Sequence, residues 1–125
     1  MTAERDDNSY LWDMLTAACA VETFVAGRTV ADYLNDLMLR SAVERQIEII
    51  GEAARHISAD FQVAHIDIPW RPIQAQRHVL AHDYGEIRYE RIWRVATVHI
   101  PALIRQLEPL LPSPPDEADN SPPSP

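Results

Sequence analysis

Hydrophobic positions recur every three to four residues along most of this chain, which is the spacing of one face of an α-helix. The pattern is clearest over residues 10–26, 37–58 and 87–110, and shorter stretches cover 30–36 and 73–82. It predicts an all-α domain, a bundle of four to five helices of the up-and-down kind. The positions expected to face the core are Leu11, Met14, Leu15, Ala18, Val21 and Val25, then Leu39, Val43, Ile47, Ile50, Ala54 and Ile57, and finally Ile92, Trp93, Val95, Ala96, His99, Leu103 and Leu107.

Glycine and proline divide these segments. Gly27 is expected to end the first helix, and Gly85 to end the helix over 73–82. Pro72 fits the first turn of that helix. Pro101 is expected to kink the last helix without ending it, because the apolar spacing resumes beyond it. The stretch 59–70 reads as a loop.

Three single residues carry structural expectations. Gly51 costs about 1 kcal/mol against alanine in an exposed helix interior, so its place in the long helix suggests a close helix–helix approach. Trp70 is expected to anchor the preceding loop in the core. Cys19, the single cysteine, can form no internal disulfide and reads as a small buried residue.

The composition changes sharply after Leu111. Residues 112–125 are rich in proline and serine and carry three acidic residues, which indicates a disordered tail. The folded domain is therefore expected over residues 8–111. No apolar run approaches the roughly 20 residues of a membrane span, and the polar, acidic start does not resemble a signal peptide. A cytoplasmic protein is expected.

The net charge of −8 argues against a protein that coats nucleic acid through bulk electrostatics. The charge is unevenly distributed, because five arginines lie between Arg71 and Arg94 against only three acidic residues. This region contains the stretch RHVLAHDY, residues 77–84, in which Arg77, His78, His82 and Tyr84 gather within eight positions.

This stretch has three interpretations. In the first, its polar residues are ordinary surface and hydrogen-bonding groups of a helix. In the second, His78 and His82, four residues apart, bind zinc, although no third ligand is evident nearby. In the third, Arg77 clamps a phosphate and His82 transfers a proton, which suffices for RNA cleavage without metal. Positions 77 and 82 lie about 140° apart on a helix, so one ligand could contact both if the helix ends before His82 or if a second copy packs against it, and the spacing alone does not decide between the two.

Arg77, four residues, His82, one residue and Tyr84 match the Arg-x4-His-x-Tyr motif of the HepT-like ribonuclease toxins, a family of HEPN domains. The resemblance extends beyond the motif. ERQIEIIGEAARHIS (44–58) resembles the long helix of that family, IPWRPIQAQRHVLAHDY (68–84) its motif helix, and IRYERIWRVATVHIPALIRQLEPLL (87–111) its closing helix.

The resemblance implies a homodimeric toxin of a HEPN and minimal nucleotidyltransferase toxin–antitoxin system of type VII kind. Arg77 and His82 match the catalytic pair of a metal-independent endoribonuclease whose substrate is RNA, with tRNA one candidate. Tyr84 matches the tyrosine that the nucleotidyltransferase antitoxin modifies with AMP. ATP and Mg²⁺ belong to that partner's reaction, and this chain is expected to need no cofactor.

One position departs from the family pattern. The residue after the motif arginine is commonly asparagine, and here it is His78, which is expected to support the catalytic pair. This departure keeps open a non-catalytic HEPN module that only binds a nucleotidyltransferase, nucleotide or RNA. A plain helical dimer outside any toxin–antitoxin system is a third possibility.

Overall fold

The computed structural model describes residues 6–82 and 85–111, without the side chains of residues 77–82. Its elements are helical throughout these ranges: α1 (Asp7–Val25), α2 (Val30–Leu34), α3 (Leu37–Arg55), α4 (Ala59–Ala64), α5 (Trp70–His82), α6 (Gly85–Arg94), a π-helical turn (Val95–His99), α7 (Ile100–Leu107) and a 3-10 turn (Glu108–Leu110). The predicted all-α class is confirmed. The predicted boundaries at residues 8 and 111 stay a prediction, and the tail lies outside the described residues.

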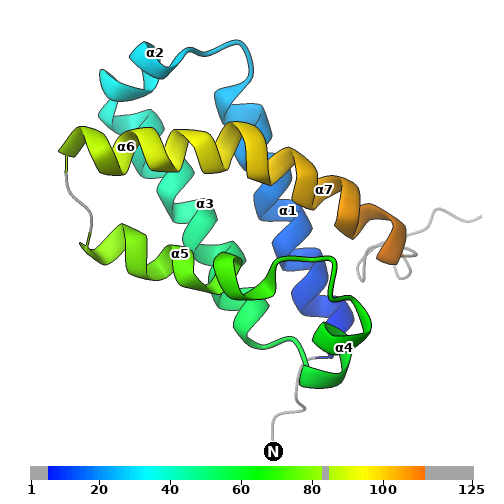
Figure 1. Ribbon diagram of the computed structural model, residues 1–125. Helices are drawn as coiled ribbons and strands as arrows, with labels where there is room; N and C mark the ends of the chain where they lie inside the picture. Colours follow the sequence, from blue (N-terminus) through cyan, green and yellow to red (C-terminus); the bar gives the residue numbers. More distant parts are fainter. Residues whose placement is uncertain (1–5, 83–84, 112–125) are drawn as a thin grey trace, which may run out of the picture.

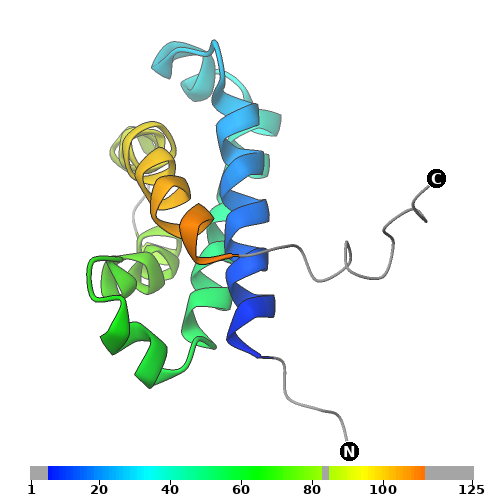
Figure 2. The ribbon, with the colours of Figure 1, turned by 90° about the vertical axis from the view of Figure 1, so that its right-hand side faces the viewer.

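The helices form two layers (Figures 1 and 2). The long helices α1 and α3 run antiparallel in one layer. In the other layer α5 packs on α3, and the continuous rod of α6 and α7 crosses α1 and α3. The hydrophobic core fills the space between the layers. Its largest fully buried side chains are Tyr33, Met14, Ile68, Ile92, Leu107, Val21 and Val43.

Helix periodicity predicted most of this core correctly. Every position expected from the first two segments is buried, as are Ile92, Ala96, Leu103 and Leu107 of the third. Trp93 and Val95 are only half-buried, and His99 is exposed, so the expectation that His99 faces the core is wrong. Cys19 is also exposed, because it lies about 100° around α1 from the buried Ala18.

The turns follow from local chemistry. Asp6 caps α1, its carboxylate accepting a hydrogen bond from the Ser9 amide at 2.9 Å. Thr29 and Asp32 form a reciprocal capping box at α2. The stretch predicted as a loop contains α4, capped by the Ser58 hydroxyl, which accepts from the Phe61 amide at 3.2 Å. Gly27 and Gly85 have φ of 72° and 67°, the left-handed region that suits glycine.

The last helix continues past Pro101 as expected, by way of the π-helical turn. Proline has no N–H to donate and its ring crowds the carbonyl four residues back, which disfavours a regular α-helix at this point. The amide of Ile100 instead donates to the Val95 carbonyl, a hydrogen bond across five residues. The extra residue in this turn shifts the register of every later side chain on the rod.

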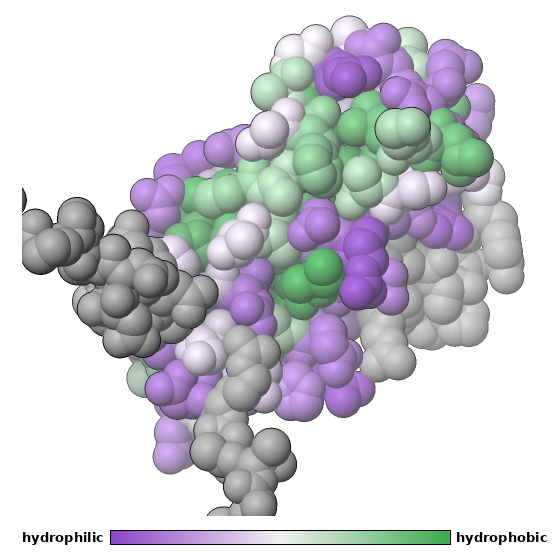
Figure 3. Space-filling view, turned by 180° about the vertical axis from the view of Figure 1, so that it is seen from behind, coloured by the Kyte–Doolittle hydropathy of each residue, from purple (hydrophilic) through white to green (hydrophobic). Residues whose placement is uncertain are grey.

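The outer face of the α1–α3 layer is divided into two halves. Figure 3 shows hydrophobic residues gathered over its upper part and hydrophilic residues over its lower part. Two exposed large hydrophobic residues, Leu37 and Met38, begin α3. Among the described residues, no helix is long and apolar enough to cross a membrane.

Helices α3 and α5 approach each other closely at Gly51. A Cβ atom at this position would lie 3.3 Å from the carbonyl oxygen of Ile73. We expect Gly51→Val to lower the free energy of unfolding by about 2 kcal/mol, since a larger side chain would push α5 away from α3. Urea denaturation would measure this, with Ser41→Val at an exposed position of α3 as the control. Equal effects of the two substitutions would contradict the close approach.

Candidate functional site

The residues singled out from the sequence belong to the end of α5 and the connection after it. Arg77, His78 and His82 occupy the last two turns of α5, whose backbone is helical through His82. Their side chains, and Tyr84 altogether, lie outside the described residues. Because the helix does not end before His82, positions 77 and 82 are separated by about 140° around its axis. A ligand could contact an arginine at 77 and a histidine at 82 together more easily if a second copy of the chain supplied one of them.

The first turn of α5 is held in place by buried contacts. Trp70 is buried, and its indole N–H donates to the carbonyl oxygen of His65 at 3.0 Å. The Trp70 ring meets Phe61 edge to face at a centroid distance of 6.1 Å. Together with the close approach at Gly51, these contacts fix α5 on α3 before the motif begins. The expected anchoring role of Trp70 is confirmed.

The helix after the motif is anchored to α3 as well. The guanidinium of Arg88, on the first turn of α6, forms a hydrogen-bonded ion pair with the Glu44 carboxylate of α3. These side chains are only 24% and 17% exposed. One turn away on α3, Arg40 lies over the ring of Tyr89 at 4.5 Å from its centroid. Helix α3 therefore holds the chain on both sides of the motif.

A buried tyrosine lies near the Glu44–Arg88 ion pair. Tyr33 is fully buried beside Trp93, with ring centroids 5.5 Å apart. Burial raises the pKa of Tyr33 far above its usual range, and the negative charge of Glu44 raises it further, so the phenol stays neutral. Within the described part of the chain, neither the Tyr33 hydroxyl nor the Arg88 Nε has a hydrogen-bond partner.

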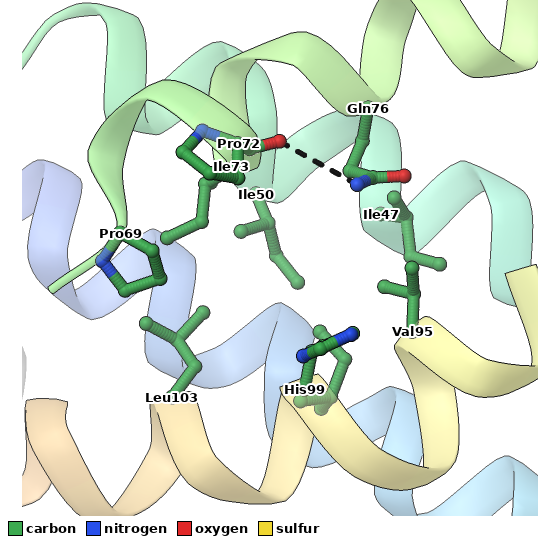
Figure 4. Close-up of a pocket in the computed structure, with 10 residues that line it drawn as sticks. Ile47, Ile50, Pro69, Pro72, Ile73, Gln76, Val95, His99 and Leu103 are labelled. Carbon is green, nitrogen blue, oxygen red and sulfur yellow. Dashed lines mark hydrogen bonds between the residues drawn. The ribbon is translucent and has the colours of Figure 1, made fainter.

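A pocket of about 230 Å³ lies between α5 and the π-helical turn (Figure 4). Its floor is formed by Ile47 and Ile50 of α3. Its walls are apolar, contributed on the α5 side by Pro69, Pro72 and Ile73, and on the rod by Val95, Ile100 and Leu103. Gln76 and His99 are the two polar side chains among these lining residues, and they approach from opposite sides. Gln76 directly precedes Arg77 on α5.

One carboxylate of the outer face, that of Glu52, has basic partners at the surface. Arg55 pairs with Glu52 at 3.8 Å, and His56 Nε2 lies 3.2 Å from the same carboxylate. The His56 ring stacks on Tyr10 at 5.0 Å. Among the side chains that the structure describes, no group of three or more His, Cys, Asp or Glu residues could hold a metal ion. The zinc interpretation of His78 and His82 concerns side chains outside that set.

Two features near the motif were not predicted from the sequence. Glu44 and Arg88 are 44 residues apart, and nothing in the local pattern of either residue indicates that they meet. His99 had been assigned to the core by its helical spacing. Pro101 was the sequence signal that could have placed His99 correctly, because a proline inside a helix often marks an altered turn just before it.

Fold and motif together define a HEPN-type helical domain, with the motif arginine and histidine on α5. The chain belongs to the ribonuclease HepT-like family, whose model matches residues 14–110. No solved structure was found to match it.

Two curated relatives illustrate the match. A Thermococcus cleftensis protein named "Probable ribonuclease HepT" is 35% identical over 107 residues, covering 86% of this chain and 97% of the relative. A Methanocaldococcus jannaschii protein named "Putative RNase MJ1380" is 33% identical over 106 residues, covering 85% of this chain and 97% of the relative. The similarity thus spans nearly the whole length of both relatives.

Proposed function

We propose that this protein is a metal-independent endoribonuclease, the toxin of a toxin–antitoxin pair. The observation that carries the proposal is the run Arg77-x4-His82-x-Tyr84 on and after the last turns of α5, in a chain of the ribonuclease HepT-like family. The relatives named as ribonucleases match 85% and 86% of this chain. The substrate is RNA, and tRNA is one candidate.

The reaction follows from the two side chains. The 2′-oxygen of a ribose attacks the neighbouring phosphorus, and the bond from phosphorus to the 5′-oxygen of the next nucleotide breaks. The Arg77 guanidinium holds the phosphate through paired hydrogen bonds and stabilises its developing charge. His82 transfers a proton, from the 2′-hydroxyl or to the departing 5′-oxygen. His78, in place of the usual asparagine, supports this pair.

A homodimer completes the site in this proposal. Arg77 and His82 lie on well-separated sides of one helix, so one phosphate is best served by two α5 helices that face each other. The anchoring of α5 and α6 on α3 would present both motif helices as rigid elements, which suits a composite cleft.

The direct test is RNA cleavage in the presence of excess EDTA. We expect the purified protein to cut RNA under these conditions and to leave a 2′,3′-cyclic phosphate on one product and a 5′-hydroxyl on the other. End-labelling of the products, with and without prior phosphatase treatment, distinguishes these ends. Cleavage that disappears with EDTA and returns with Mg²⁺ would contradict the metal-independent reaction.

Neutralisation acts through Tyr84 in the same proposal. A nucleotidyltransferase partner transfers AMP from ATP, with Mg²⁺, to the Tyr84 hydroxyl, and pyrophosphate leaves. The added negative charge and bulk would repel RNA from a phosphate-binding cleft.

We expect co-expression with the cognate nucleotidyltransferase to raise the intact mass by one or more AMP units and to suppress cleavage. Tyr84→Phe is the matched variant, since it keeps the ring and removes the acceptor oxygen. It should cleave RNA and show no gain in mass. An unchanged gain in Tyr84→Phe would place the modification elsewhere.

A non-catalytic binding module is the second candidate. The observation that favours it is His78, which stands where the family commonly has asparagine. The net charge of −8 is also unusual for a protein that contacts RNA widely. Such a module would bind its partner, nucleotide or RNA without producing cut ends, so the cleavage test separates the two.

A further inference from the structure

We infer that the pocket between α5 and the π-helical turn binds one nucleobase of the RNA substrate, beside the phosphate that is cut. The inference rests on the proposed ribonuclease function and adds to it a specificity site with two named residues, Gln76 and His99. Four observations carry it: the size of the pocket, the chemistry of its lining, its opening, and its place next to the motif.

The size suits a flat ring system. Pockets for drug-sized ligands start at about 300 Å³, so a pocket of about 230 Å³ takes a smaller group. Its isoleucine, proline and valine walls can cover the two faces of a base, as apolar side chains do in enzymes that take a base out of its stack. A whole nucleotide would leave its charged phosphate and sugar outside.

The two polar side chains can recognise the edge of a base. The Gln76 amide offers both a donor and an acceptor, and the neutral His99 imidazole offers one of each. In the structure Gln76 donates to the Pro72 carbonyl at 3.5 Å, longer than the usual 2.7–3.2 Å, so little is lost when it turns to a ligand. Figure 4 shows Gln76 and His99 reaching toward the same space from facing elements.

The pocket is open to solvent. Pro69, Pro72 and His99 are exposed although they line it, so a base can enter without a rearrangement of the core. The π-helical turn explains why a histidine lines a mostly apolar pocket. Its extra residue turns His99 out of the core, where the helical spacing had placed it. Turns of this kind occur frequently at functional sites.

The position links the pocket to the reaction. Gln76 precedes Arg77 directly, and the six steps from Gln76 to His82 span about 9 Å along the axis of α5. A base held by Gln76 therefore belongs to a nucleotide next to the phosphate that Arg77 and His82 act on. Single-stranded RNA can present such an unstacked base, which is the usual basis of sequence-specific RNA recognition.

The first experiment measures cleavage preference on a set of single-stranded RNAs that differ only in the bases flanking one cut site. We expect the full-length protein to prefer one base. Gln76→Leu and His99→Leu should each reduce that preference about fivefold, roughly the contribution of one hydrogen bond, because cleavage of the favoured RNA falls more than cleavage of the least favoured RNA. Gln74→Leu, on the same helix but outside the pocket, should keep the full preference.

The second experiment fills the pocket. Val95→Phe places a ring inside it, whereas Val98→Phe places the same ring on the same π-helical turn but outside the lining. We expect Val95→Phe to raise KM at least tenfold and to abolish the base preference, and Val98→Phe to behave like the unmodified protein. Circular dichroism of both variants would establish that each is folded.

A readout that does not depend on cleavage separates this inference from the proposed function. NMR titration with each of the four nucleoside 3′-monophosphates should shift the His99 ring signals, and Val95→Phe should remove the shifts. Shifts in a protein that cuts no RNA would overturn the ribonuclease proposal and keep the base pocket. An RNA-cleaving protein with no shifts and unaltered preference in Gln76→Leu and His99→Leu would overturn the base pocket.

One further outcome would assign the pocket to a different occupant. If Val95→Phe converts a dimer to monomers, as judged by light scattering, while base preference stays intact in the two leucine variants, the pocket receives a side chain of a second copy. The nucleobase assignment would then be wrong.

Discussion

Replacing His82 by alanine should lower the rate of RNA cleavage by a factor of about 10² to 10⁴, which is the usual contribution of general acid–base catalysis. Arg77→Ala should have an effect of about 10² or more, because a developing charge loses a preorganised donor. Arg77→Lys should recover only part of the loss, since an ammonium group keeps the charge but cannot make the paired hydrogen bonds of a guanidinium.

The controls come from the same chain. Arg71→Ala removes an exposed arginine from the first turn of α5, and His56→Ala removes a histidine from the outer face of the α1–α3 layer. Both should keep nearly full cleavage. Single-turnover rates at saturating RNA would distinguish a loss of chemistry from a loss of binding. Full cleavage in His82→Ala would exclude it as the proton-transfer group and direct attention to His78.

A mixed-dimer experiment tests whether the site draws on two copies. If Arg77 of one copy and His82 of the other act on one phosphate, a mixture of inactive Arg77→Ala and inactive His82→Ala proteins should regain activity. In a statistical mixture about half of the dimers would pair the two variants, and each carries one intact combination. No recovery, despite proven subunit exchange, would indicate that both residues must come from one chain.

Helix periodicity predicted the fold because the long helices bury a regular stripe. Every position expected from α1 and α3 is buried, since a helix of 19 residues presents a continuous apolar face to its neighbours. Helix α4 was missed for the same reason. It has six residues and buries none of them, so it leaves no stripe, and its Ser58 cap depends on a local hydrogen bond.

The motif could be found from the sequence because its residues are neighbours in the chain. The contacts between distant residues around the motif could not be found in this way. Glu44 and Arg88 meet only because α6 folds back over α3, and Gln76 and His99 face each other only because the rod returns alongside α5. His99 was assigned to the core because ideal helical spacing was assumed, and the π-helical turn before Pro101 invalidates that assumption.

The Glu44–Arg88 ion pair should be one of the most sensitive structural positions outside the core. Both side chains are mostly removed from solvent, so deletion of one partner leaves the other charge poorly solvated. We expect Glu44→Ala and Arg88→Ala each to lower the free energy of unfolding by about 2 kcal/mol, between the values for exposed and fully buried pairs. Denaturant titration would measure both.

The outer face supplies a matched comparison. Arg55 pairs with Glu52 at 3.8 Å, and both side chains are about half exposed. Arg55→Ala should therefore cost about 0.5 kcal/mol or less, because solvent screens the pair and hydrates the remaining carboxylate. A cost equal to that of Arg88→Ala would mean that burial does not set the importance of the Glu44–Arg88 pair.

Glu44→Ala and Arg88→Ala should also reduce RNA cleavage, because the Glu44–Arg88 ion pair fixes the first turn of α6 directly after the motif. An arginine could also act by contacting RNA, but a glutamate would repel phosphate. Equal losses of cleavage in Glu44→Ala and Arg88→Ala would therefore indicate a positioning role, whereas a loss confined to Arg88→Ala would indicate contact with RNA.

The double variant Glu44→Met with Arg88→Met separates stability from position, since an apolar pair can restore stability without restoring a directed ion pair. If cleavage returns together with stability, α6 needs only to be held against α3. If stability returns and cleavage does not, the orientation imposed by the ion pair is what the motif requires.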